Sequence, residues 1–128
     1  MKKYILFLLL LVVFANTKTA SMDNPLHIQE NETLHVKATA YCPCSKCCGK
    51  WADGITYTGT KATQGRTIAV DPKVIPLGTK VLIDGQIYIA EDIGGGIKGN
   101  RIDVFFDCHN EALKWGVKKL EIEIKSTY

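Results

Sequence analysis

Apolar and polar residues alternate in two stretches near the ends of the chain. In residues 33–41 the two sides of the alternation are Leu34, Val36, Ala38 and Ala40 against His35, Lys37, Thr39 and Tyr41. In residues 120–125 they are Leu120, Ile122 and Ile124 against Glu121, Glu123 and Lys125. A period of two residues places one side of a β-strand against the core and the other toward solvent. Each stretch therefore predicts a strand with one buried face.

Four more β-prone runs lie between these two, and turn residues separate them. The runs are residues 67–70, 79–83, 86–90 and 101–106. The dipeptide Asp84-Gly85 joins two of them and favours the two-residue turn of a β-hairpin. All 11 glycines lie between Gly49 and Gly116. Many short strands separated by glycine predict an all-β barrel or sandwich.

Helical signals are confined to two short segments. Residues 71–76 start with an aspartate cap and a proline at the first helical position, and they end at a second proline. Residues 108–115 predict another short helix, with Gly116 in the left-handed conformation as its stop. Residues 42–65, rich in glycine and cysteine, are interpreted as an ordered loop. The expected total is six short strands and two helical turns.

The first residues predict the compartment. Two lysines precede an unbroken apolar run over residues 4–14, and small and polar residues follow. This order is typical of a secretory signal peptide. At about 1.5 Å per residue the run is too short for a bilayer core of about 30 Å, although an uncleaved anchor stays an alternative. We therefore predict a signal peptide at residues 1–20, a polar lead-in at 21–32 and one domain at 33–128.

Charge adds little once the signal peptide is removed. The formal net charge of +3 includes Lys2, Lys3 and Lys18, and the first 20 residues contain no acid. The remaining chain then carries 13 basic and 13 acidic residues and is neutral. A neutral domain gives no support to a nucleic-acid partner. We expect a secreted monomer that needs no cofactor and does not touch the membrane once the signal peptide is cleaved.

Asp103 is the first candidate for chemistry. It lies within an alternating run in which Ile102 and Val104 face the core, so that Arg101 and Phe105 share its face. Burial beside an aromatic ring raises the pKa of a carboxyl group, and a neighbouring arginine lowers it. A site acid and a solvated arginine–aspartate pair both fit this pattern.

Two other aspartates stand at turns. Asp92 precedes Gly94-Gly95-Gly96, where it suits either an Asx turn or a carboxylate at the mouth of a cleft. The glycine run is not followed by a lysine and a hydroxyl residue, so it lacks the pattern of a phosphate loop. Asp71 is explained by helix capping alone.

The cysteines allow two interpretations. Cys42, Cys44, Cys47 and Cys48 lie within seven residues, and Cys108 is far away and next to His109. Disulfides are the default in an exported protein, although five thiols leave one unpaired. A metal site on the four clustered cysteines is the less favoured alternative, because a second group of ligands would offer only Cys108, with or without His109. A cysteine protease is disfavoured, because the adjacent side chains of Cys108 and His109 diverge.

Four blocks of sequence resemble one known family. They are Ala38-Thr39-Ala40-Tyr41, Ala69-Val70-Asp71-Pro72, Ile75-Pro76-Leu77-Gly78-Thr79 and the segment from Ala90 to Phe106. In this order they resemble the three-aspartate (3D) domain over roughly residues 34–124. The resemblance implies a six-stranded double-psi β-barrel, similar to the catalytic domain of membrane-bound lytic transglycosylase A and to stationary-phase survival wall enzymes.

The resemblance also implies roles for the three aspartates. Asp103 corresponds to the catalytic acid and base, Asp92 supports it, and Asp71 is a third site residue. Ile93 stands where the family usually has threonine, so a hydroxyl group near Asp92 is missing. The cysteine cluster occurs in one branch of the family only, and no role is carried over to it.

The expected function is cleavage of the MurNAc–GlcNAc bond of peptidoglycan by a lytic transglycosylase. Residues expected to hold the glycan are Lys98, Asn100, Arg101 and Phe105. An expansin-like module that binds wall polysaccharide without cleaving it is the main alternative. A domain that senses or stores metal through its cysteines is a third.

Overall fold

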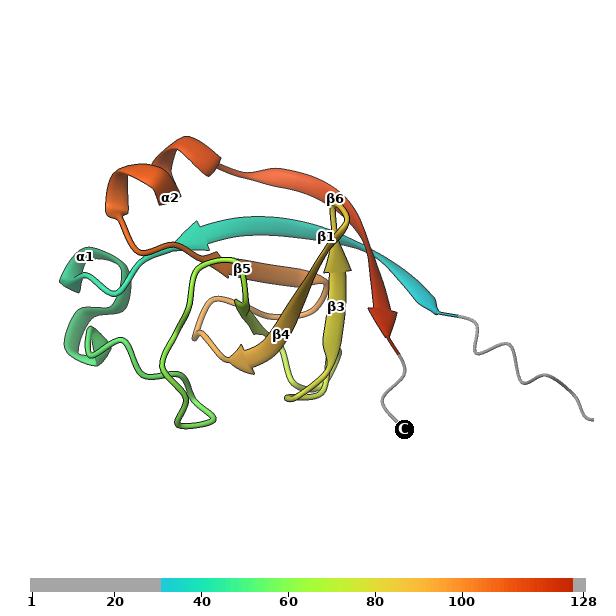
Figure 1. Ribbon diagram of the computed structural model, residues 1–128, viewed down its shortest axis with the longest axis horizontal. Helices are drawn as coiled ribbons and strands as arrows, with labels where there is room; N and C mark the ends of the chain where they lie inside the picture. The colour runs from blue at the N-terminus through green and yellow to red at the C-terminus, as the bar shows by residue number, and fades with distance from the viewer. Residues whose placement is uncertain (1–30, 126–128) are drawn as a thin grey trace, which may run out of the picture.

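The computed structural model describes residues 31–125, which form a closed six-stranded barrel with few short helices (Figure 1). The strands are β1 (Glu32–Tyr41), β2 (Thr67–Val70), β3 (Lys80–Ile83), β4 (Gln86–Asp92), β5 (Arg101–Phe105) and β6 (Lys118–Lys125). All six were predicted, each within two residues at either end, and the expected all-β barrel is confirmed. The predicted signal peptide lies outside the described residues.

The barrel closes in the order β1-β5-β2-β4-β3-β6. Two neighbouring pairs, β1 with β5 and β2 with β4, are parallel, and the other four pairs are antiparallel. Strands adjacent in space are therefore often distant in sequence, as the double-psi arrangement requires. The longest pairing joins β1 to β6, and it places Glu32 opposite Ile124.

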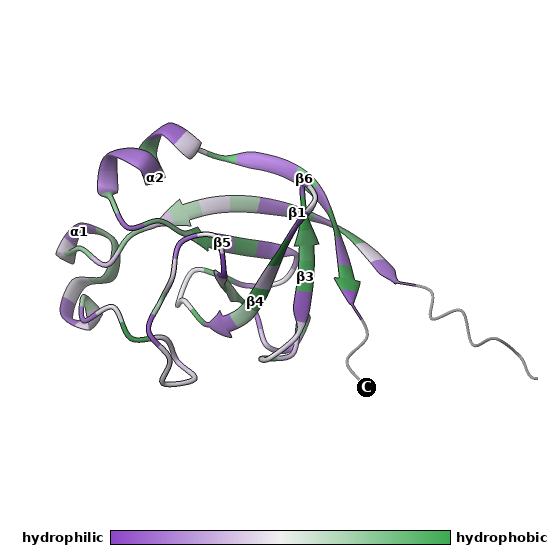
Figure 2. Ribbon diagram, in the orientation of Figure 1, coloured by the Kyte–Doolittle hydropathy of each residue, from purple (hydrophilic) through white to green (hydrophobic). Residues whose placement is uncertain are grey.

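The interior is filled by aliphatic side chains from every strand. The hydrophobic residues of the strands are the green segments of Figure 2. Ile68, Val70, Val81, Ile102 and Ile122 are at most 1% exposed. Burying such a side chain contributes about 1.5–3 kcal/mol, so this cluster supplies the main favourable term in folding. The alternation predicted for β1 is observed from its start to Ala38, and it ends where Thr39 and Tyr41 become partly buried.

Of the two turn conformations predicted from the sequence, one is observed. Asp84 and Gly85 have φ angles of 47° and 81°, which the two-residue hairpin between β3 and β4 requires. Gly116 has the expected positive φ of 72°, but its ψ of −143° lies outside the left-handed helical region. The chain leaves the preceding helix in an extended direction, because it must enter β6 directly.

Helices differ from the prediction in two places. Helix α2 (His109–Trp115) is present as expected, whereas residues 71–76 form one hydrogen-bonded turn around Asp71 and no helix. Conversely, the predicted loop at residues 42–65 contains α1 (Ser45–Cys48) and the 3₁₀ helix η1 (Gly49–Trp51). Helices this short carry no sequence period that would reveal them. Across residues 31–125, no helix has the length and apolar character needed to span a membrane.

Candidate functional site

A row of four residues crosses the barrel wall. Strand register places Thr39 beside Asp103, Asp103 beside Ala69, and Ala69 beside Asp92. Neighbouring strands are about 4.8 Å apart, so the backbones of the two aspartates are separated by roughly 10 Å. Only the methyl group of Ala69 lies between them in the row. The arrangement leaves an open space between two carboxyl groups.

A β-bulge aims Asp92 into this space. The register between β2 and β4 pairs Ile68 with Ala90 but Ala69 with Asp92, so that Glu91 is an extra residue in β4. Without the extra residue, Asp92 would lie on the same face as Ala90, which is fully buried in the core. Bulges of this kind redirect side chains, and they are common next to active sites.

Glu91, the extra residue of the bulge, is stabilised by hydrogen bonds of its own. Its carboxylate is 3% exposed, accepts a hydrogen bond from Thr67 Oγ1 at 2.7 Å, and accepts two from the Arg66 guanidinium at 3.2 Å each. Burial alone would raise the pKa of Glu91, but the bonds from Arg66 and Thr67 outweigh it and lower that pKa. A charged, paired Glu91 thus anchors the bulge.

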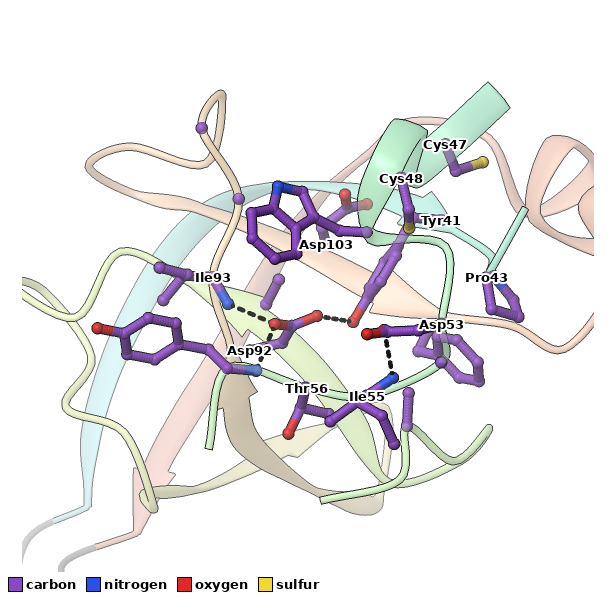
Figure 3. A pocket seen from close by; sticks show the side chains of 18 residues that line it. Tyr41, Pro43, Cys47, Cys48, Asp53, Ile55, Thr56, Asp92, Ile93 and Asp103 are labelled. Carbon is purple, nitrogen blue, oxygen red and sulfur yellow. Dashed lines mark hydrogen bonds between the residues drawn. The ribbon is translucent and has the colours of Figure 1, made fainter. Parts of the chain in front are cut away.

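The two aspartates line a cavity of about 720 Å³ (Figure 3). This volume falls within the range typical of small-molecule sites. One wall comes from the barrel and the other from the loop after β1. The lining residues used below are Tyr41, Trp51, Tyr57, Asp92, Ile93, Asp103 and Phe105.

Asp92 is held by three donors at the centre of the cavity (Figure 3). Its Oδ2 accepts a hydrogen bond from the Tyr41 hydroxyl at 2.7 Å, and its Oδ1 accepts bonds from the backbone N–H groups of Tyr57 and Ile93, both at 2.9 Å. The bond from Ile93 N–H is the Asx-type contact considered from the sequence. Asp92, at the end of β4, therefore joins the barrel to the loop between β1 and β2, which we call the cavity loop.

Asp103 has a different environment. Its Oδ1 accepts one hydrogen bond, from Thr39 Oγ1 at 3.0 Å. Burial raises the pKa of Asp103 to about 6; the Thr39 bond and the charge of Arg101 act to lower it, and the charge of Asp92 acts to raise it. A carboxyl group of this kind exchanges its proton near neutral pH, which general acid–base catalysis requires.

Aromatic rings support this pair of carboxyl groups. The Tyr41 and Phe105 rings meet edge to face, with centroids 5.4 Å apart. Burial and the bond to Asp92 raise the pKa of Tyr41, so its hydroxyl group stays a donor. The Phe105 side chain, 2% exposed, excludes water from one side of the cavity.

The cavity has an apolar rim. Trp51 and Tyr57 are 70% and 66% exposed, and Ile55 and Ile93 are also exposed. Exposed apolar groups gathered around a cavity are typical of a ligand-binding groove. The sequence did not identify Trp51 and Tyr57 as site residues, because the loop after β1 has no regular spacing of apolar residues. It also did not indicate the hydrogen bond from Tyr41 to Asp92. The only sequence signal was two large aromatic residues in a glycine-rich segment.

Asp71 lies outside the cavity lining. Its Oδ1 accepts a hydrogen bond from Lys73 N–H at 3.1 Å, and its Oδ2 accepts one from Gly99 N–H at 2.9 Å. These two backbone bonds, the one from Gly99 first, lower the pKa of Asp71. The residue thus ties the turn after β2 to the loop before β5. We infer that it orders the site from a distance.

Of the four residues expected to bind glycan, one lines the cavity and three do not. Phe105 lines the cavity, but Lys98, Asn100 and Arg101 do not. Lys98 and Asn100 are exposed on the loop before β5. Arg101 donates a hydrogen bond to Gly96 O at 3.2 Å and braces the glycine loop; among residues 31–125 it makes no ion pair with Asp103. The solvated arginine–aspartate pair is therefore not observed.

The cysteines gather at one end of the cavity. All five are free in the described structure. Cys42, Cys44 and Cys47 lie together with His109, whereas Cys48 lines the cavity and Cys108 is exposed. The four-cysteine set suggested by the sequence is thus replaced by three cysteines and a histidine.

The chain is similar in sequence to proteins that are named for the bacterial cell wall. Residues 66–125 match the sequence model of the family described as the 3D domain. YabE of Bacillus subtilis, named for cell wall shaping, is 45% identical over 115 residues, which are 84% of this chain and 28% of YabE. The cell wall-binding protein YocH of the same organism is 40% identical over 114 residues, which are 85% of this chain and 38% of YocH. The chain thus spans less than half of either relative.

Among solved structures, the Escherichia coli protein MltA, described as having a unique lytic transglycosylase fold, superposes with a TM-score of 0.49. The aligned part covers 58% of this chain and 28% of that one, with 23% identity.

Proposed function

We propose that this chain, whose residues 66–125 match the 3D domain, is a lytic transglycosylase that cleaves the MurNAc–GlcNAc bond of peptidoglycan during turnover or remodelling of the cell wall. The observation that carries the proposal is Asp103, a half-buried carboxyl group with a pKa of about 6 across a cavity from a fixed carboxylate. The names of YabE and YocH support a role at the cell wall. Residues 1–20, as a signal peptide, would take the domain there.

The first step uses Asp103 as an acid. Its protonated carboxyl group donates a proton to the glycosidic oxygen as the bond to MurNAc C1 breaks. The sugar then develops the positive charge of an oxocarbenium ion. The Asp92 carboxylate, across the cavity, stabilises that charge without moving, since three donors hold it.

The second step uses the same residue as a base. The Asp103 carboxylate accepts the proton of the MurNAc 6-hydroxyl group, whose oxygen attacks C1 and closes a 1,6-anhydro ring. A hydrolase would need a second carboxylate free to activate water or to attack the sugar. Three of the four lone pairs of Asp92 are already engaged. An intramolecular nucleophile removes this need.

Product analysis tests the proposal. The purified chain is incubated with peptidoglycan, and the soluble fragments are separated and weighed by mass spectrometry. Anhydro-muropeptides are the expected product. Fragments with reducing ends, which are one water molecule heavier, would identify a hydrolase instead.

Activity should depend on pH through Asp103. The acid step needs the protonated form, and burial raises the pKa of that carboxyl group to about 6. We therefore expect kcat/KM to fall as pH rises through about 6, approaching a tenfold loss per pH unit above it. Initial rates of fragment release between pH 4.5 and 8 measure this. A rate that stays constant to pH 8 would remove Asp103 as the acid.

A wall-binding module is the second candidate, and the exposed aromatic rim favours it. Trp51 and Tyr57 offer flat apolar surfaces to sugar rings whether or not a bond is cleaved. The two candidates differ in a simple assay. A module co-sediments with peptidoglycan and releases no fragments, whereas the enzyme releases them.

Trp51→Ala tests the rim in either case. Loss of a large exposed ring at a binding surface costs about 1–2 kcal/mol, so we expect affinity for peptidoglycan to fall about 5- to 30-fold. Co-sedimentation at increasing peptidoglycan concentration measures the change. Ile87→Ala is the matched control, because Ile87 is an exposed apolar residue of β4 outside the cavity lining. Equal affinities for both variants and the parent would show that the rim does not bind.

A further inference from the structure

Three thiols and one imidazole converge at a single point beside the cavity. Cys42 Sγ lies 3.0 Å from Cys44 Sγ and 3.4 Å from Cys47 Sγ. His109 Nδ1 is 3.5 Å from each of the three sulfur atoms. All four atoms lie within 4.8 Å of one another. The cluster is therefore compact in every direction.

The chain brings these residues together by local and distant contacts. Cys44 starts α1, and its carbonyl oxygen accepts hydrogen bonds from the N–H groups of Cys47 and Cys48 at 3.1 and 2.9 Å. This turn folds Cys47 back toward Cys42. The parallel pairing of β1 with β5 ends at Tyr41 and Phe105, so the segments that follow both strands leave the barrel side by side. One segment carries Cys42, and the other leads to α2 and His109.

The geometry matches a tetrahedral metal site. With ligand bonds of about 2.3 Å to sulfur and 2.0 Å to nitrogen, the edges of such a tetrahedron are roughly 3.5–3.8 Å. The three sulfur–nitrogen distances fall at this value. Cys42 Sγ lies 3.0 Å from Cys44 Sγ and 3.4 Å from Cys47 Sγ, which is about 0.8 and 0.4 Å shorter than the sulfur–sulfur edge. Three soft sulfur ligands with one imidazole are a donor set that selects zinc.

We propose that Cys42, Cys44, Cys47 and His109 bind one structural Zn²⁺ ion. The ligand set is closed, because four protein atoms complete the tetrahedron and leave no position for substrate. Cys48 is outside the set: its thiol donates a hydrogen bond to Cys42 O at 3.2 Å and faces the cavity. The exposed Cys108 is also outside it.

Other uses of the cluster fit less well. A disulfide would join two of the three sulfur atoms and leave a thiol and an imidazole beside it without a partner. A catalytic thiol needs one sulfur atom paired with one imidazole nitrogen. Here His109 Nδ1 is equidistant from three. The arrangement instead surrounds a point.

A zinc ion at this point would fix one wall of the cavity. Cys42 directly follows Tyr41, which holds Asp92, and Cys47 lines the cavity itself. The ion would connect the end of β1, the loop that carries the aromatic rim, and α2. The proposed role of the ion is to order the site. This role is the same whether the domain cleaves glycan or only binds it.

Metal analysis of the full chain, purified without chelator, tests the proposal. We expect one zinc per chain by elemental analysis and native mass spectrometry, and three reduced thiols in the cluster. Removing the zinc should lower the Tm by on the order of 10 °C, because binding energy at such sites is folding energy. Replacement by Co²⁺ should give the visible spectrum of a tetrahedral thiolate complex.

Four variants define the ligand set. Cys44→Ser and His109→Ala should lose zinc, whereas Cys48→Ser and Cys108→Ser should keep one per chain. Where a ligand variant fails to fold, the Co²⁺ spectrum of the parent chain decides, because three thiolates and two give different charge-transfer intensity. A parent chain that lacks metal and contains a disulfide among Cys42, Cys44 and Cys47 would overturn the proposal. Zinc retained by His109→Ala and lost by Cys48→Ser would overturn the ligand set.

Discussion

Asp103→Asn should abolish glycan cleavage and leave glycan binding intact. The amide cannot donate the proton that the departing sugar needs, and loss of a general acid costs about 10²- to 10⁴-fold in rate. Shape and polarity at the position change little, so affinity for peptidoglycan should stay within a fewfold. Fragment release and co-sedimentation, measured on the same preparation, separate the two effects.

Although Asp103→Asn should abolish activity, it should make the folded chain more stable at neutral pH. Burial raises the pKa of Asp103 to about 6 in the folded chain, above the value of about 3.9 for an unfolded aspartate. Between these values the folded state binds more protons, so stability falls as pH rises from about 4 to 6. Asparagine does not titrate. The variant should therefore have a higher Tm than the parent at pH 7, and the advantage should disappear below about pH 4.

Asp107→Asn is the matched control for both effects. Asp107 follows the same strand but is exposed and outside the cavity lining. We expect the control to retain the activity and the pH dependence of the parent chain. Unimpaired release of anhydro-muropeptides by Asp103→Asn would show that another group supplies the proton.

Asp92→Ala should destabilise the site as well as inactivate it. The substitution leaves three donors without their acceptor: the Tyr41 hydroxyl and the N–H groups of Tyr57 and Ile93. Water can satisfy part of them, so we expect a loss of about 2–4 kcal/mol in the free energy of unfolding. This corresponds to a decrease in Tm of about 10–20 °C. The rate of fragment release should fall at least about 100-fold, because the charge opposite Asp103 is lost.

Two milder variants show whether the network acts as a unit. Tyr41→Phe removes one of the three hydrogen bonds and should cost about 1 kcal/mol. Asp53→Ala removes a single bond, to Ile55 N–H at 2.9 Å, within the exposed loop, and should change the Tm little. Thermal unfolding of all three variants gives the comparison. An Asp92→Ala chain as stable as Asp53→Ala would mean that the cavity loop is held by other contacts.

The strands were predictable because each has a local cause. Alternation marks β1 and β6, and the Asp84-Gly85 pair needs only its own backbone conformation to make a hairpin. The site was predictable in part. Asp103 was identified because its neighbours Ile102 and Val104 had to face the core, and both are buried. Its rise in pKa depends on the cavity, which local pattern does not contain.

Features created by distant pairing were not predictable. Residues 86–90 form a β-prone run like that of an ordinary strand, and only pairing with β2 reveals that Glu91 is an extra residue. The direction of Asp92 follows from that bulge. His109 is likewise 67 positions from Cys42, so its place in the cysteine cluster depends on the register of β1 with β5. Asp71 combines both cases, because local capping of its turn accounts for the bond from Lys73 N–H, whereas the bond from Gly99 N–H comes from a segment 28 positions away.

The pairing of β1 with β6 determines how the domain can be attached to anything else. Glu32 lies opposite Ile124, so both ends of the described chain leave the barrel at the same place. The other end of β1 is ten residues or about 30 Å away; there Tyr41 lines the cavity, and α1 and α2 lie at that end of the barrel (Figure 1). A tether or a fused module joined at either end would therefore be attached at the end of the barrel away from the cavity. The face that carries the cavity would then point away from the attachment point, free to contact a rigid polymer.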